Sequence, residues 1–170
     1  MIEFLQFDLL FLKTGEVRQP DPRKILFLLD TIGNVGKSSF FKYLYFKNPT
    51  SIGRVTYGSA SQLRSSFINN RTKKIYIVDL PRTKGKEDRI EEILSTIEDA
   101  KNGMISSNMY GVGTTLLMEP PHIIVSSNYV IDQNALSEDR WESYEIQKAS
   151  KKLKNVIEAL KRNQKSNEEI

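Results

Sequence analysis

A glycine-rich stretch that ends in lysine and serine has the residue types for chemistry in this 170-residue chain. It reads Gly33, Asn34, Val35, Gly36, Lys37, Ser38 and Ser39. Glycines let such a backbone curl so that successive N–H groups point inward at phosphate oxygens, and a helix that starts here adds its partial positive charge. Lys37 would then reach the β- and γ-phosphates, and the Ser38 hydroxyl would ligate Mg²⁺. We therefore predict that these residues bind ATP with Mg²⁺, although contacts to phosphates alone do not distinguish ATP from GTP.

The stretch departs from the strict pattern G-x-x-x-x-G-K-[ST]. That pattern has its first glycine five residues before the second, where this chain has Thr31. A chance Gly-Lys-Ser at a helix start is the alternative interpretation. An apolar run before the stretch and an amphipathic segment after it favour the phosphate-binding loop.

Two polar residues, Asp79 and Asn128, each close another apolar run. An Asp at the end of a neighbouring strand holds Mg²⁺ from the side opposite Ser38, usually through water. An amide such as Asn128 can orient water and contact the γ-phosphate, although strand-terminal turns also favour asparagine. No second acid follows Asp79, so the sequence does not identify the group that activates the attacking water.

These residues need strands and helices to position them. Apolar runs at Ile25–Leu29 and at residues 75–78 and 123–125 predict strands buried on both faces, while residues 38–46 and 87–100 have helical spacing. One further strand–helix unit fits between Lys37 and Asp79, and residues 106–118 suit a hairpin or an exposed loop. The alternation predicts an α/β fold of the P-loop NTPase class, with a mostly parallel central sheet flanked by helices. Ligands bind at the carboxyl edge of such sheets.

Composition excludes several other chemistries. The chain has no cysteine and one histidine, His122, which excludes disulfides, thiolate metal sites and metal sites that need two histidines. We expect a structural role for His122. The apolar stretch at residues 1–12 is too short to span a bilayer and contains Glu3 and Asp8, so we expect an intracellular protein that is neither membrane-bound nor secreted. The net charge of +4 allows a nucleic-acid partner without requiring one.

Four ordered stretches together resemble a known family. They are residues 30–38, 78–82, 120–128 and 136–141, and residues 20–25 resemble the start of the same domain. All are similar to the superfamily 3 helicase domain of the replication initiator proteins (Rep) of circular single-stranded DNA viruses, the CRESS-DNA or circovirus-like viruses. The resemblance implies an AAA+-like ATPase that works as a hexameric ring on single-stranded DNA, in the host nucleus.

The resemblance also implies residue roles. Asn128 becomes the sensor of the γ-phosphate, and Arg140 becomes an arginine finger that reaches the γ-phosphate of a neighbouring subunit. The alternative for Arg140 is a structural ion pair with Asp139 or Glu138.

Residues 102–111 resemble the family's pore-lining hairpin that grips DNA. Many members have Lys-Tyr where this chain has Met109-Tyr110, so one phosphate contact is missing. Tyr110 could still stack on a base, and Lys101 could replace some of the lost charge. A packing role for Tyr110 and a solvated Lys101 are the alternatives.

One family feature is absent from the sequence. Full-length initiators have a nicking domain with a His-x-His metal site, which a chain with one histidine does not contain. We therefore expect a helicase unit alone. Residues 1–20 would be an N-terminal helical remnant of the oligomerisation region, residues 21–146 the ATPase domain, and residues 147–170 a C-terminal helix with a polar tail. An RNA helicase of the same superfamily and a nucleotide-binding assembly module with little hydrolysis are the alternative functions, whereas a small-molecule kinase leaves Asn128 and residues 136–141 unexplained.

Overall fold

The computed structural model describes residues 10–12, 14–33, 36–55, 58–80, 87–108 and 113–146. The predicted N-terminal segment lies partly, and the predicted C-terminal helix wholly, outside the described residues, so the domain boundaries stay predictions. Among the helices within these ranges, none is long and apolar enough to cross a membrane.

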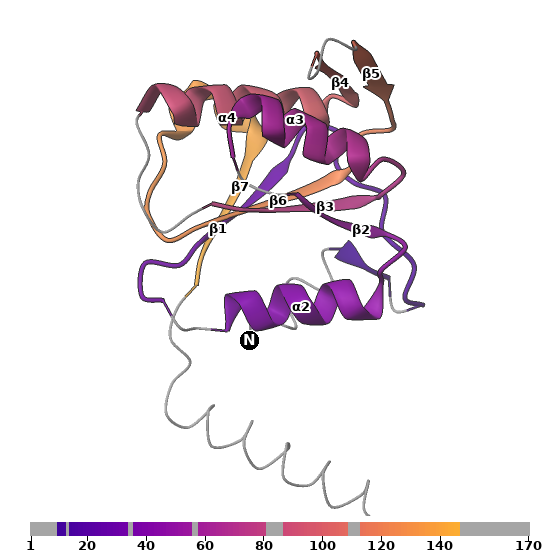
Figure 1. Ribbon diagram of the computed structural model, residues 1–170. Helices are drawn as coiled ribbons and strands as arrows, with labels where there is room; N and C mark the ends of the chain where they lie inside the picture. Colours follow the sequence, from indigo (N-terminus) through magenta and orange to yellow (C-terminus); the bar gives the residue numbers. More distant parts are fainter. Residues whose placement is uncertain are drawn as a thin grey trace, which may run out of the picture.

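A five-stranded parallel sheet forms the centre of the molecule (Figure 1). Its order is β2 (Ile52–Val55), β3 (Ile75–Asp79), β6 (His122–Ser127), β1 (Ile25–Leu29) and β7 (Trp141–Glu145). All four pairings between neighbouring strands are parallel. The predicted α/β class with a mostly parallel sheet is confirmed.

Helices cover both faces of this sheet (Figure 1). Helices α3 (Ala60–Asn69) and α4 (Glu87–Lys101) lie on one face, and α2 (Lys37–Lys47) lies on the other. Successive strand residues point to opposite faces, so the apolar strands supply two cores. Phe27, Tyr76, Val78 and Val125 pack in the cluster of α4, while Leu26, Leu28, Ile77 and Ile124 pack in the cluster of α2.

Two strands and one helix were not located from the sequence. Strand β2 and helix α3 form the strand–helix unit that was expected between Lys37 and Asp79, but without assigned positions. Helix α3 begins with a capping box, in which Ser59 and Gln62 exchange side-chain and backbone hydrogen bonds. This Ser-x-x-Gln pattern is a local signal that could have located the helix. Strand β7 lacks such a signal because most of its residues are polar.

Strand β6 is longer than predicted, because it includes His122 at its start and Ser126 and Ser127 at its end. The His122 ring lies with Nε2 2.8 Å from the carbonyl oxygen of Arg18. Burial lowers the pKa of His122, which favours the neutral ring. These contacts tie β6 to the segment before β1, in agreement with the expected structural role.

The predicted hairpin is present as a separate two-stranded antiparallel sheet. It consists of β4 (Met104–Ser107) and β5 (Thr114–Leu117), which lie beside the ends of α3 and α4 in Figure 1. Gly103 precedes it with a φ of 79°, and a Cβ at this position would lie 2.2 Å from the carbonyl oxygen of Met118. Glycine is therefore required where the chain leaves α4.

Candidate nucleotide-binding site

The sheet brings the predicted polar residues to one edge and one face. Asp30, Asp79 and Asn128 lie at or just beyond the carboxyl ends of β1, β3 and β6, which are parallel neighbours. Asp30 lies two residues after Leu28, and Asp79 lies two residues after Ile77; both Leu28 and Ile77 pack in the hydrophobic cluster beneath α2. Asn128 is likewise an even number of residues from a side chain of β6 in that cluster. Since the strand period is two, all three point toward the face that α2 covers. Helix α2 begins at this edge, so the expected cluster forms.

Lys37 lies at the centre of this cluster. It is the first residue of α2, and it is only 7% exposed. Its Nζ lies 3.4 Å from Asn128 Oδ1 and 3.7 Å from Asp79 Oδ1. Strong hydrogen bonds from an ammonium are shorter, at about 2.7–2.9 Å. The ammonium is therefore held between two oxygens without a short bond to either, which suits a group that must also contact a phosphate.

The two loop glycines have the conformation that the motif requires. Gly33 has a φ of 72° and Gly36 a φ of 91°, both in the left-handed region that favours glycine. Gly36 caps α2, and it forms no side-chain cap hydrogen bond. The first turn of α2 also has no acidic residue. The N–H groups at this helix start are therefore left for an anion. Asn34 and Val35 lie outside the described residues.

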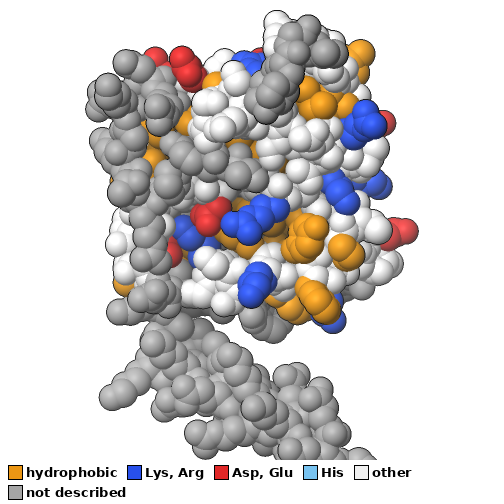
Figure 2. Space-filling view, viewed as in Figure 1, with side chains coloured by type: hydrophobic (Ala, Val, Ile, Leu, Met, Phe, Trp, Pro, Cys, Tyr) orange, Lys and Arg blue, Asp and Glu red, His pale blue; other side chains and the backbone are white. Residues whose placement is uncertain are grey.

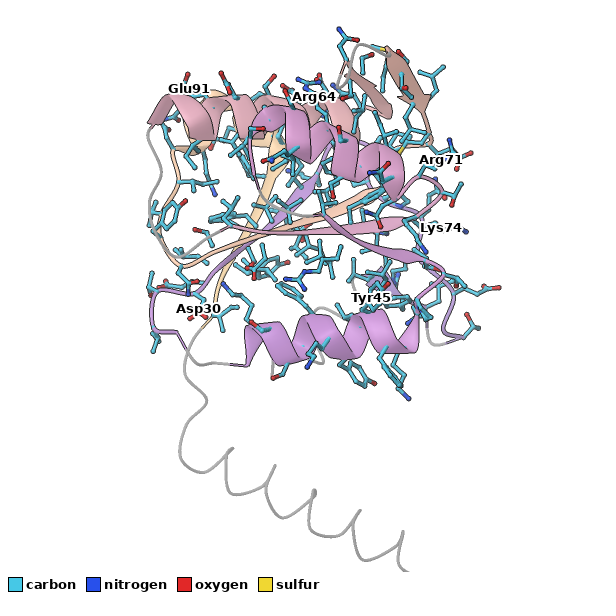
Figure 3. All side chains as sticks on the ribbon, in the orientation of Figure 1. Asp30, Tyr45, Arg64, Arg71, Lys74 and Glu91 are labelled. Atoms are coloured by element: carbon cyan, nitrogen blue, oxygen red, sulfur yellow. The ribbon has the colours of Figure 1, made fainter. Side chains whose placement is uncertain are left out.

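Asp30 begins the stretch that resembles the family's phosphate loop, but the sequence assigned no role to its side chain. It is 2% exposed, and its Oδ1 accepts a 2.7 Å hydrogen bond from the N–H of Gly33. Its carbonyl oxygen accepts a 2.9 Å bond from Asn128 Nδ2, and Figure 3 shows Asp30 beside the loop that leads into α2. The Asp-x-x-Gly spacing was a usable signal, since Asp side chains often bond backbone N–H groups a few residues ahead.

Asn128 thus connects two parts of the site. One atom of its amide contacts Lys37 and the other holds the backbone of Asp30. A movement of the amide at one contact would also move the atom that makes the other contact. This arrangement is compatible with a sensor, and that role stays a prediction.

Asp79 and Ser38 are the predicted Mg²⁺ ligands, and both line a cavity of about 560 Å³. Ser126 Oγ donates a hydrogen bond to Asp79 Oδ1, which orients the carboxylate. The described residues contain no group of three or more His, Asp or Glu side chains that could hold a metal ion. This donor set fits Mg²⁺ that is bound together with a nucleotide, because Mg²⁺ typically takes one or two carboxylates plus phosphate oxygens and waters. Ser39, next to Ser38, is exposed on the first turn of α2.

Arg140, the predicted arginine finger, has a largely buried side chain in this single chain. Its side chain is 7% exposed, and one terminal nitrogen lies 3.1 Å from Glu98 Oε1 and 2.9 Å from Asn102 Oδ1. It precedes β7 at the amino edge of the sheet, opposite Lys37. Within its own chain Arg140 forms an ion pair with Glu98 of α4 and not with the adjacent acids that the alternative named, and the finger role in a neighbouring subunit stays a prediction. Asp139 instead pairs with Arg23.

Lys101, the predicted nucleic-acid contact with a solvated lysine as the alternative, lies in the interior. It is 1% exposed, and its Nζ donates a 2.6 Å hydrogen bond to the carbonyl oxygen of Pro121. Desolvation by burial lowers the pKa of Lys101 to about 8. A lysine enclosed in this way is not available to a phosphate on the surface. Tyr110, the other predicted contact, lies outside the described residues.

Comparisons with known proteins bear on this geometry. No protein-family model matches the chain. It is 35% identical over 130 residues to Para-Rep C10 of Milk vetch dwarf C10 alphasatellite, and 34% identical over 130 residues to Para-Rep C7 of Faba bean necrotic yellows C7 alphasatellite. Each match covers 76% of this chain but only 44% of the relative, so the chain spans less than half the length of these relatives.

The fold also has a solved counterpart. The X-ray structure of JCV helicase bound to an inhibitor matches with a TM-score of 0.50 at 15% identity, over 76% of this chain and 37% of that protein. At this identity the likeness concerns the fold alone. The sequence matches confirm the resemblance to Rep proteins, and the structural match shows a fold like that of JCV helicase.

Proposed function

We propose that this chain is an ATP-dependent helicase or translocase, because it is similar in sequence to Para-Rep proteins and its fold resembles that of JCV helicase. It would act on single-stranded nucleic acid during viral DNA replication and hydrolyse ATP, with Mg²⁺, at the loop before α2. By the resemblance, this work takes place in the host nucleus.

The observation that carries the proposal is the convergence of Lys37, Asp79 and Asn128 at the start of α2. The ammonium lies 3.4 Å from an amide oxygen and 3.7 Å from a carboxylate oxygen, which supports the proposal that it would contact a terminal phosphate. Bound Mg²⁺ would neutralise phosphate charge, and this chain would position it through Ser38 and Asp79. Left-handed glycines and an uncapped helix start supply backbone donors for the other phosphate oxygens.

The test is phosphate release from ATP with and without single-stranded DNA, for the wild type and for Lys37→Ala. We expect the strand to stimulate turnover, and Lys37→Ala to abolish both ATP binding and turnover. Lys47→Ala is the matched control, because it removes the same charge at the far end of α2. A wild-type protein that assembles yet shows no phosphate release with any strand would refute the helicase proposal.

The polymer and the assembly are further parts of the proposal. A homo-oligomeric ring, hexameric by the resemblance, would enclose the strand, with the β4–β5 hairpin facing it. The same contacts to phosphates would suit RNA. Competition between DNA and RNA strands of one sequence distinguishes the two polymers, and solution mass with and without ATP and Mg²⁺ reports the assembly.

A nucleotide-binding assembly module with little hydrolysis is the second candidate. The burial of Arg140 favours it, since that side chain is only 6% exposed and is paired with Glu98 of its own chain. In this case ATP would change the solution mass through Lys37 while no phosphate is released under any condition.

A further inference from the structure

The cavity beside Ser38 and Asp79 extends away from the phosphate loop. Its volume of about 560 Å³ is larger than one phosphate group needs, and its remaining walls are aromatic and basic. Besides Ser38 and Asp79, it is lined by Phe41, Lys42, Tyr45, Phe46, Arg54 and Ile77. Figure 2 shows basic and hydrophobic side chains together on the surface between the sheet and α2. The known site residues account for only one end of this cavity.

Helix and strand periodicity place two cations in it. Lys42 is four residues after Ser38 on α2, so the two side chains share one helix face. Arg54 is paired in register with Ile77 on the neighbouring strand, and Asp79 is two residues further along that strand. Arg54 and Asp79 therefore point to the same face of the sheet. Strand spacing and rise put their Cα atoms about 8 Å apart, within the reach of an arginine side chain.

Both cations are available to an external anion. Arg54 and Lys42 are exposed, and neither side chain is in an ion pair within the part of the chain that the structure describes. Arg64 and Arg140, by contrast, are each paired with an acid of α4.

The charges of the site leave a role for such a cation. Lys37 lies against Asp79, so their charges largely offset one another before a nucleotide binds. A Mg²⁺-bound nucleoside triphosphate keeps a net negative charge, and cations aimed at its terminal phosphate stabilise the transition state of phosphoryl transfer. Arg140 is paired at the opposite edge of the sheet and does not supply this charge to the site of its own chain.

We propose that Arg54, with Lys42 beside it, contacts the terminal phosphate of the bound nucleoside triphosphate from within the same chain. This inference rests on the proposed function, because it assumes that a triphosphate occupies the loop before α2. The planar guanidinium of Arg54 suits two phosphate oxygens at once, whereas Lys42 adds a point charge. Arg54 then distinguishes a triphosphate from a diphosphate, since a diphosphate lacks the group that it contacts.

The primary experiment compares the dissociation constants of ATP and ADP, each with Mg²⁺, by calorimetry on the full chain. The variants are Arg54→Ala, Arg54→Gln and Arg54→Lys. The matched control is Arg71→Ala, which removes an exposed arginine after α3 (Figure 3). We expect Arg54→Ala and Arg54→Gln to weaken ATP binding about ten- to a hundredfold, the value of a lost charged hydrogen bond, without changing ADP binding. Arg54→Lys should retain part of the preference, and Arg71→Ala should change neither constant.

A mixing experiment tests whether Arg54 acts within its own chain. Lys37→Ala lacks a working loop but retains Arg54, while Arg54→Ala has the reverse defect. If Arg54 reaches the nucleotide of its own chain, a mixture of the two proteins stays as inactive as each alone. Recovery of ATP turnover in the mixture would show that Arg54 acts across an interface, and would overturn the proposal.

Other results separate this inference from the proposed function. Wild type that binds neither nucleotide, or binding that Lys37→Ala does not reduce, contradicts both. Binding that depends on Lys37 but has the same ATP-to-ADP ratio in Arg54→Ala as in wild type contradicts the role of Arg54 alone. Loss of binding to a single-stranded oligonucleotide in Arg54→Ala, with that ratio unchanged, would assign the cavity to the strand.

Discussion

Replacing Arg140 by methionine distinguishes an internal ion pair from an arginine finger. The structure predicts a small effect on stability. One terminal nitrogen of Arg140 forms an ion pair with Glu98 and donates a hydrogen bond to Asn102, and hydrogen bonds to a charged group contribute about 1.5–3 kcal/mol. The atoms Nε and Nη1 are buried without a hydrogen-bond partner among the described residues, and such unsatisfied groups cost about 1–3 kcal/mol each. These contributions largely cancel, so Arg140→Met should remain within about 1 kcal/mol of wild type.

Two further variants, Arg140→Ala and Glu98→Gln, should lose more stability than Arg140→Met. Arg140→Ala also removes two buried methylenes and leaves a cavity, which together should destabilise the fold by about 2–3 kcal/mol and lower Tm by about 4–10 °C. Glu98→Gln leaves the buried guanidinium without its acid. It should cost about 1–2 kcal/mol, less than a fully buried pair, because the Glu98 side chain is 34% exposed.

Urea unfolding of the three variants, together with ATP turnover at several protein concentrations, is the assay. We expect stability to follow the order wild type and Arg140→Met, then Glu98→Gln, then Arg140→Ala. Turnover of Arg140→Met should stay within about threefold of wild type, because this side chain does not extend toward a phosphate. Two results together would refute the internal ion pair: unchanged stability in all three variants, and loss of turnover when Arg140 is replaced in an assembled protein. They would support the arginine-finger role of Arg140.

Three further predictions concern the loop and the buried lysine. Gly36→Ala should destabilise the fold by about 1–2 kcal/mol in thermal unfolding through its φ of 91° alone, since no atom lies within 4 Å of the added Cβ. Asp30→Ala should weaken ATP binding, seen as a smaller rise in Tm with ATP, because the N–H of Gly33 loses its acceptor, whereas Asp30→Asn should retain most of that rise. The pKa of Lys101 is about 8 in the fold and 10.5 unfolded, so between these pH values the unfolded chain binds more protons and stability should rise with pH. The rise should be at most about 3 kcal/mol and absent in Lys101→Met, and equal pH profiles for the two proteins would contradict the shifted pKa.

The loop and the strand ends were predictable because their signals are local. Gly33, Gly36 and Lys37 stand in a short segment whose function depends on its own backbone and on the helix that follows. Asp79 and Asn128 are recognisable because each closes an apolar run, and parallel strands bring such ends to one edge. The order of these residues along the chain therefore predicted the composition of the site before its geometry was known.

Other outcomes depended on contacts between distant segments. An apolar run that is buried on both faces does not reveal which face α2 covers. Only the folded sheet shows that the side chains of Asp79, Asn128 and Arg54 point toward the face that α2 covers. Strand β7 lies at a sheet edge, where polar side chains face solvent and leave no hydrophobic alternation to recognise.

The sequence by itself determined that a phosphate loop, an acid and an amide follow three parallel strands. Only the tertiary structure decided which of the other cationic side chains are buried and which are exposed. Arg140 and Lys101 are charged residues that sequence patterns assign to a surface, yet Glu98 and the carbonyl oxygen of Pro121 hold them in the interior. Arg54 has no such partner among the described residues and remains free beside the site. The physical reason is that a charge can be buried only where a partner offsets its desolvation, and the chain's folding alone places those partners.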